Sequence, residues 1–212
     1  MPLPQQNEHF EKGDFQGYRT YGICQVAKCF TAFHEIHTFS PVSGSYFAVL
    51  DDPRGIDGDG ARTAEAAGYP PADTGAWRIT PDADGRTTLG KDGAILECRS
   101  VLITPGQALW FHWAFLRFDW SPANDFAVFA AYADDKVDQP STYQAILAQS
   151  LELERQNRWY TDWQAFSWRP QTPFSGTLRW IASNGISTSI PLPRPGADAR
   201  PSALLLDCIT IE

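Results

Sequence analysis

The sequence predicts an all-β protein built as one sandwich of two antiparallel sheets. Three observations support this prediction. Aromatic residues make up 13% of the 212 residues, and a single Met is present, which favours strands over a helical bundle. The chain also contains 16 Gly and 16 Pro, many of them between short apolar segments, as turn residues are. Finally, the strand-like segments lack the alternating helices that a parallel sheet needs between its strands.

The strand-like segments are short and rich in β-branched and aromatic residues. Near the start of the chain they cover residues 21–27, 31–39 and 46–50. Gly, Asp, Pro and Ala dominate residues 51–93, where we expect long loops and one short strand at 77–80. Later strands are expected at 95–103, 108–118, 126–132, 163–168, 176–182 and 203–211. Because no linker interrupts this series, we expect residues 1–212 to form one domain.

Residues 141–154 fit two interpretations. Tyr143, Ile146, Leu147 and Leu151 share one face of a helix, but Tyr143, Leu147 and Leu151 also share one face of a strand. We favour the strand.

Charge and hydropathy exclude two classes of partner. Seventeen basic and 25 acidic residues give a net charge of −8, and no cluster of basic residues offsets it, which disfavours nucleic acid and anionic membranes. No apolar stretch approaches the roughly 20 residues of a membrane-spanning helix. The N-terminus has no basic segment followed by an apolar one, so we expect no signal peptide. Cytoplasmic location and leaderless export both remain open.

The four cysteines are too few for a disulfide scaffold in a chain of this length. A bridge between Cys24 and Cys29 and a fully reduced set are both open, and we favour reduced, buried thiols.

Several spaced segments resemble bacterial jelly-roll modules. They are residues 10–18 (FEKGDFQGY), 43–50 (SGSYFAVL), 122–127 (PANDFA), 161–167 (TDWQAFS), 175–178 (SGTL) and 202–209 (SALLLDCI). Their order and spacing are similar to those of galactose-binding-like jelly rolls, a group that includes carbohydrate-binding modules and adhesin domains. The resemblance implies a single jelly-roll β-sandwich with long loops around 51–93. It does not by itself fix an activity, since fold does not determine function.

The resemblance also implies a structural calcium ion. In such modules the Glu of the opening segment and the Asp of the closing strand hold Ca²⁺, and the matching residues are Glu11 and Asp207. Asp14 is a candidate third ligand. Ca²⁺ takes six to eight oxygens, which carboxylates and backbone carbonyls supply. Where the family usually has a second acidic residue after the closing Asp, this chain has Cys208, so such a site has one carboxylate fewer.

The aromatic residues favour a glycan ligand. Sugar rings stack their C–H faces on Trp or Tyr, while their hydroxyls need amides and carboxylates nearby. Along residues 108–118, Trp110 and His112 occupy one strand face and Phe111 and Trp113 the other, and one face must be core. The candidate binding residues therefore lie on or beside loops with polar neighbours: Trp120, Asn124, Asp125, Tyr160 and Trp163.

We therefore predict a non-catalytic, glycan-binding protein of the lectin or carbohydrate-binding-module kind. No nucleophile elbow, reactive cysteine or phosphate loop is present, so an enzyme is not expected. The first alternative is a protein-interaction or adhesion module with an exposed aromatic patch. A second is a small glycoside-processing hydrolase, which needs two carboxylates at catalytic separation.

Overall fold

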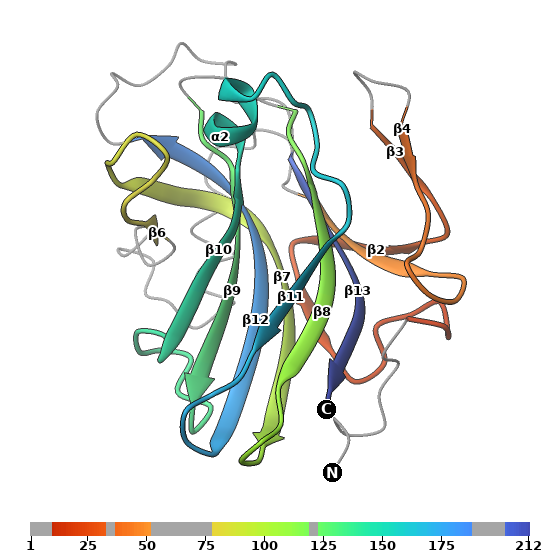
Figure 1. The fold of residues 1–212 in the computed structure, drawn as a ribbon, viewed down its shortest axis with the longest axis vertical. Helices are drawn as coiled ribbons and strands as arrows, with labels where there is room; N and C mark the ends of the chain where they lie inside the picture. The colour runs from red at the N-terminus through yellow and green to blue at the C-terminus, as the bar shows by residue number, and fades with distance from the viewer. Residues whose placement is uncertain (1–9, 33–36, 52–77, 119–122, 188–201) are drawn as a thin grey trace.

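The computed structural model describes residues 10–32, 37–51, 78–118, 123–187 and 202–212. In this part of the chain, two antiparallel sheets pack face to face (Figure 1). Between β7 and β13, successive strands repeatedly change sheet, as the connections of a jelly roll do. The predicted all-β sandwich is therefore confirmed.

Each sheet brings together strands that lie far apart in the sequence. The first sheet has the order β1 (Arg19–Tyr21), β7 (Thr88–Ile103), β12 (Phe174–Ser187), β9 (Phe126–Ala133) and β10 (Tyr143–Gln149), with β6 (Arg78–Ile79) paired to β7. The second sheet has the order β11 (Gln164–Trp168), β8 (Leu109–Leu116), β13 (Ala203–Ile211), β5 (Phe47–Asp51) and β2 (Ile23–Ala27). A separate hairpin joins β3 (Phe30–Ala32) to β4 (His37–Phe39).

Aromatic side chains fill the space between the two sheets. Trp180 of β12 is fully buried and packs edge-on against Phe111 of β8, with 5.6 Å between ring centroids. Phe129 of β9 lies 5.4 Å from the same Phe111 ring. Burial of side chains this large accounts for much of the aromatic content without any ligand.

A second apolar cluster lies on the outer face of the second sheet. Val49, Ala114 and Leu205 occupy neighbouring positions on β5, β8 and β13. Phe39 of the β3–β4 hairpin packs against this cluster. This outer face is therefore covered near the hairpin, while Trp110 on the same face of β8 is 43% exposed.

Strand β7 begins inside the predicted loop region. It starts at Thr88, whereas the sequence predicted a strand from residue 95. Gly93 lies so close to β12 that a Cβ there would come within 2.1 Å of the Ala182 carbonyl oxygen. The glycines of this segment were predicted to lie in loops, but in the structure they permit close pairing of β7 with β12. The short strand expected at 77–80 is present as β6.

Residues 141–154 divide between the two interpretations. The first part forms strand β10, as predicted, and the second forms α2 (Ser150–Arg155), which the strand prediction missed. Leu151 and Leu153 of this short helix are buried. The backbone N–H of Leu151 donates to the Asn124 side-chain oxygen at 3.2 Å. This tertiary contact stabilises the helix start, and local sequence periodicity does not reveal it.

Candidate functional site

The residues predicted to bind a ligand separate into two structural clusters. Trp120 lies outside the described residues. Asn124 and Asp125 are fully buried at the start of β9. The Asn124 amide donates to Thr88 Oγ1 at 2.8 Å and to Gln149 Oε1 at 3.3 Å. Asp125 accepts hydrogen bonds from the Ser202 hydroxyl and the Gly185 backbone N–H. These two side chains therefore connect strand ends within the protein.

This buried polar network continues into the turn before β7. Asp82 accepts backbone N–H groups from Asp84 and Arg86, both at 2.9 Å, and the Thr88 hydroxyl at 2.9 Å. The N–H of Ala83 donates to Gln149 Oε1 at 2.8 Å. The network thus fixes the turn at residues 82–86 against the end of β10.

Tyr160 and Trp163 hold the β3–β4 hairpin on the second sheet. The Tyr160 ring stacks on His37, with 4.4 Å between centroids and 12° between planes. The Trp163 indole N–H donates to the Ser40 carbonyl at 2.9 Å, and its ring meets Phe39 edge-on. Both side chains are half-buried. The structure brings this pair together, and ligand binding by the five predicted residues stays a prediction.

Glu11 and Asp207 bracket one short loop. Asp207 Oδ2 accepts the backbone N–H groups of Val42 and Ser43, at 2.7 and 3.2 Å. Glu11 Oε1 accepts those of Ser45 and Tyr46, at 2.7 and 3.1 Å. The two predicted calcium ligands therefore lie on either side of residues 42–46.

Asp14 lies on a separate turn, where its side chain accepts the Gln16 N–H at 3.0 Å. Within the described residues, no group of three His, Cys, Asp or Glu side chains is placed to hold a metal ion. The structure therefore brings Glu11 and Asp207 to one loop and does not add Asp14 to them.

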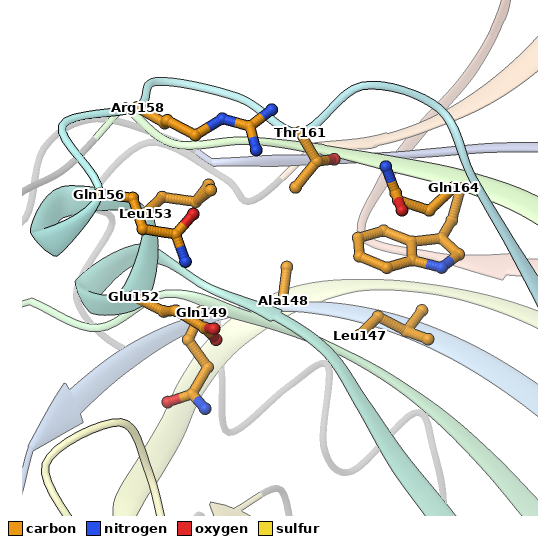
Figure 2. A pocket seen from close by; sticks show the side chains of 10 residues that line it. Leu147, Ala148, Gln149, Glu152, Leu153, Gln156, Arg158, Thr161 and Gln164 are labelled. Carbon is orange, nitrogen blue, oxygen red and sulfur yellow. The ribbon is translucent and has the colours of Figure 1, made fainter.

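A cavity of about 210 Å³ lies where the edge strands of the two sheets face each other (Figure 2). We call this side of the sandwich the open edge; it is formed by β10 and β11. Trp113, from the neighbouring strand β8, provides an aromatic wall. The other lining residues come from β10, α2, β11 and the α2–β11 loop: Leu147, Ala148, Gln149, Glu152, Leu153, Gln156, Arg158, Thr161 and Gln164.

Trp113 differs from Trp163 and Trp168 in its contacts. It is half-buried against the core, yet among the described residues its ring stacks on no aromatic side chain and its indole N–H donates to no partner. Trp163 and Trp168, in contrast, each pack against other rings. Gln164 and Leu147 line the same cavity (Figure 2). A half-buried indole whose ring face and N–H have no partner among the described residues can stack on the ring of a ligand.

The loop after α2 is held in place above this cavity. The Arg117 guanidinium lies 4.3 Å from the centre of the Trp159 ring, and its Nε donates to the Arg158 carbonyl at 3.3 Å. The Thr161 hydroxyl accepts the Phe115 N–H at 2.9 Å. The Arg158 side chain, which lines the cavity, donates to Asp162 at 3.3 Å. Arg158 and Thr161 are thus positioned by neighbours outside the cavity.

A second cavity, of about 720 Å³, lies at the other end of the open edge. Its aromatic wall is a stacked pair, Tyr143 of β10 and Trp168 of β11, with 5.1 Å between centroids and 21° between planes. Polar side chains in the lining include Arg169 and Gln171. Both cavities are therefore bounded by the same two edge strands or the residues adjoining them.

Trp113 is not among the binding residues predicted from the sequence. Its strand was predicted, but the sequence left open which of the two strand faces is core. In the structure the face of Trp113 is the core face, with Leu109, Phe111 and Phe115 buried. The sequence does not show that β10 and β11 end their sheets beside it. The polar residues between 152 and 164 were the available signal, and they were assigned instead to Tyr160 and Trp163.

No protein-family model matches the chain, and no curated protein matches it. Similar solved structures include the CBM22-1 xylan-binding domain from Paenibacillus barcinonensis Xyn10C, with 14% identity and a TM-score of 0.43, covering 100% of this chain and 92% of that one. The K3 cleaved adhesin domain of Lys-gingipain from Porphyromonas gingivalis has 9% identity and a TM-score of 0.39, covering 98% of both chains. The CBM22-1–GH10 modules of Clostridium thermocellum xylanase 10B have 12% identity and a TM-score of 0.34, covering 96% of this chain and 27% of that one.

All three identities are 14% or lower, and the similarity assigns no ligand to this chain. In the described residues, no helix is long and apolar enough to span a membrane.

Proposed function

We propose that this protein binds a saccharide, without changing it chemically, in the cavity beside Trp113. The principal support is the state of the Trp113 ring. It forms the wall of a cavity of about 210 Å³ and, among the described residues, stacks on no other ring. Small-molecule sites typically combine an apolar wall with a few positioned polar groups, and this cavity has both.

The polar lining matches the needs of sugar hydroxyl groups. The amides of Gln156 and Gln164 both donate and accept hydrogen bonds, the Glu152 carboxylate accepts them, and the Arg158 guanidinium donates them. A pyranose that stacks its C–H face on Trp113 exposes its hydroxyls at the ring edge, toward such groups. The mixture of donors and acceptors favours a neutral sugar, as does the net charge of −8.

The acidic residues that line this cavity favour a site that binds sugar without hydrolysing it. Retaining and inverting glycosidases generally use a pair of carboxyl groups, roughly 5 to 9.5 Å apart. The described lining of the Trp113 cavity includes one carboxylate, that of Glu152. We therefore propose a binding site rather than a hydrolytic one.

A titration tests this proposal. The intact protein is titrated, with tryptophan fluorescence and calorimetry as readouts, against xylose, glucose, mannose, N-acetylglucosamine and their neutral linear hexasaccharides. At least one of these sugars is expected to bind with millimolar to micromolar affinity, which corresponds to about 4–8 kcal/mol. Trp113→Ala is expected to weaken that binding at least about tenfold, because it removes the stacking wall.

Trp110→Ala is the matched control. Trp110 lies on the same strand but on the opposite sheet face, and it is 43% exposed. Its removal is expected to leave sugar affinity unchanged. The proposal fails if no sugar of the panel binds, or if Trp110→Ala rather than Trp113→Ala abolishes binding.

A structural calcium ion at the loop between Glu11 and Asp207 is a further part of the proposal. Glu11 Oε1 is used by two backbone N–H groups, and its Oε2 accepts no hydrogen bond within the described part of the chain. Because no third acidic side chain joins the pair there, backbone carbonyls and water would supply the remaining oxygens. Such an ion would strengthen the attachment of residues 42–46 to the closing strand.

A further inference from the structure

We propose that the two cavities on the open edge are the two ends of one elongated site, which takes a linear, neutral oligosaccharide rather than a single sugar. This inference rests on the proposed function and names the ligand class of the same site. The smaller cavity contains Trp113, and the larger one contains the Tyr143–Trp168 pair. One extended chain would contact both.

Strand register sets the separation of the two ends. In the pairing of β11 with β8, Gln164 lies opposite Trp113, and Trp168 lies opposite Leu109. Four residues of antiparallel strand therefore separate the two aromatic walls, a length of about 13 Å. One pyranose ring is much shorter than this span, so a ligand that touches both walls must contain several linked rings.

The larger cavity has its own stacking surface. Trp168 is only 8% exposed, because Tyr143 covers one side of it and Phe174 meets it edge-on. Tyr143 is half-buried and lines the cavity. Tyr143 is therefore the aromatic side chain of this pair that offers more surface to a ligand.

Small or apolar side chains lie along the middle of the open edge. Ala145 of β10 lies opposite Phe129 in register, so it points toward the sandwich interior, yet it remains partly exposed. Phe166 of β11 is also half-buried, and it packs 4.8 Å from Phe111 and 5.6 Å from Phe129. In the proposed site, a central sugar ring passes between the two ends over the small Ala145 side chain and the Phe166 ring.

The charges along the open edge favour a neutral chain. Each cavity lining contains side chains of both signs, Glu152 with Arg158 at one end and Asp134 with Arg169 at the other. A polyanionic chain would meet carboxylates at both ends as well as the overall charge of −8.

Chain length and three substitutions test the inference. For the sugar type that binds best in the panel above, affinity is measured for the monosaccharide through to the hexasaccharide. Affinity is expected to rise about tenfold or more over this series, because a longer chain reaches the second aromatic wall. Tyr143→Ala is expected to remove most of this rise and to leave monosaccharide affinity unchanged.

Two further variants separate binding from folding. Tyr143→Phe keeps the ring and is expected to keep the chain-length dependence. Ala145→Trp places a large side chain at the middle of the open edge and replaces no lining residue of either cavity, and it is expected to remove the same dependence. Thermal unfolding of each variant identifies any loss of sugar affinity that comes from misfolding. If one variant misfolds, the remaining variants test the inference.

The possible outcomes distinguish this inference from the proposed function. If Trp113→Ala abolishes binding while hexasaccharide affinity equals that of the monosaccharide, or survives both Tyr143→Ala and Ala145→Trp, the elongated site is wrong and the Trp113 site stands. If no sugar of any length binds, both proposals are wrong.

Discussion

Asp207 accepts the backbone N–H of Val42 at 2.7 Å, although the two residues are 165 positions apart in the sequence. The same carboxylate accepts the N–H of Ser43, and its other oxygen accepts that of Cys208 at 2.7 Å. Asp207 is fully buried. The closing strand β13 is therefore attached to residues 42–46 through a carboxylate that several N–H groups share.

Asp207→Asn is expected to destabilise the protein by about 1–3 kcal/mol, because it weakens charge-assisted bonds and puts an amide donor among buried N–H groups. Urea unfolding measures this difference. Asp14→Asn is the control, since Asp14 is exposed and accepts the Gln16 N–H within its own turn. Equal stability of the two variants would contradict the role given to Asp207.

Calcium is expected to raise the unfolding midpoint of the protein, and EDTA to lower it. An ion that binds only the folded state stabilises by about 2.7 kcal/mol at a hundredfold excess over its dissociation constant. Glu11→Gln is expected to reduce this response, since it removes one of the two carboxylates at the loop. Identical melting curves with EDTA and with excess Ca²⁺ would remove calcium from the proposal.

Asn124→Ala is expected to destabilise the protein by about 2–4 kcal/mol. The substitution removes two donated hydrogen bonds and leaves the buried N–H of Leu151 without its acceptor. Circular dichroism with urea measures the loss. Gln171→Ala, at an exposed position, is expected to change stability by less than about 0.5 kcal/mol. A small effect of Asn124→Ala would show that the network tolerates the loss.

The outcome for Asn124 and Asp125 shows where prediction from the sequence ends. Alternation of apolar residues predicted β8, β9 and β13, because one face of each strand is core. Local patterns do not report which polar residues close a network between distant segments, such as Asn124 with Thr88 and Gln149. In the sequence, the residues of a buried polar network are of the same types as the residues of a ligand site, so residue type does not distinguish the two.

Trp113 shows a second limit. The sequence left open which face of its strand is core, and in the structure Trp113 lies on the core face but is only half-buried, because two sheets end beside it. Tyr160 and Trp163 have polar neighbours in the sequence, but they pack on the β3–β4 hairpin. The exposure of an aromatic side chain depends on which strands lie at sheet edges, and that arrangement is a property of the whole fold.

Cys24 and Cys208 are expected to react slowly with thiol reagents at pH 8, and Cys29 rapidly. Burial raises the pKa of the Cys24 thiol to about 12, and burial together with the neighbouring Asp207 carboxylate raises the pKa of Cys208 to about 12. Few thiolates are therefore present at these two positions, and the thiolate is the reactive form. Cys29 is exposed. Cys29→Ser is expected to remove the fast phase of labelling.

The same two thiols make stability depend on alkaline pH. In the unfolded chain they ionise near the ordinary pKa of 9.0, while in the folded protein they stay protonated to about pH 12. The unfolded state therefore loses protons first, and the stability from these groups is complete below pH 9 and declines as pH rises toward 12. A Cys24→Ser/Cys208→Ser variant is expected to show a shallower decline of the unfolding midpoint. An unchanged slope would contradict this assignment.

Glu97→Gln is expected to be among the most destabilising substitutions in the protein. Arg179 Nε and Nη2 donate to Glu97 Oε2 at 2.8 and 2.6 Å, and both side chains are fully buried. Removing one charge of such a pair typically costs about 3–5 kcal/mol, because the other remains buried without its counter-charge.

A double-mutant cycle tests this explanation. Glu97→Leu combined with Arg179→Met replaces both charges by apolar groups, and the pair is expected to cost less than either single substitution does. Arg99→Lys is the control, since Arg99 also contacts Glu97, at 2.5 Å, but its side chain is 37% exposed. Urea unfolding of the wild type, the two single variants and the double variant gives the coupling energy. Additive losses in the double variant would mean that the cost comes from packing rather than from an isolated buried charge.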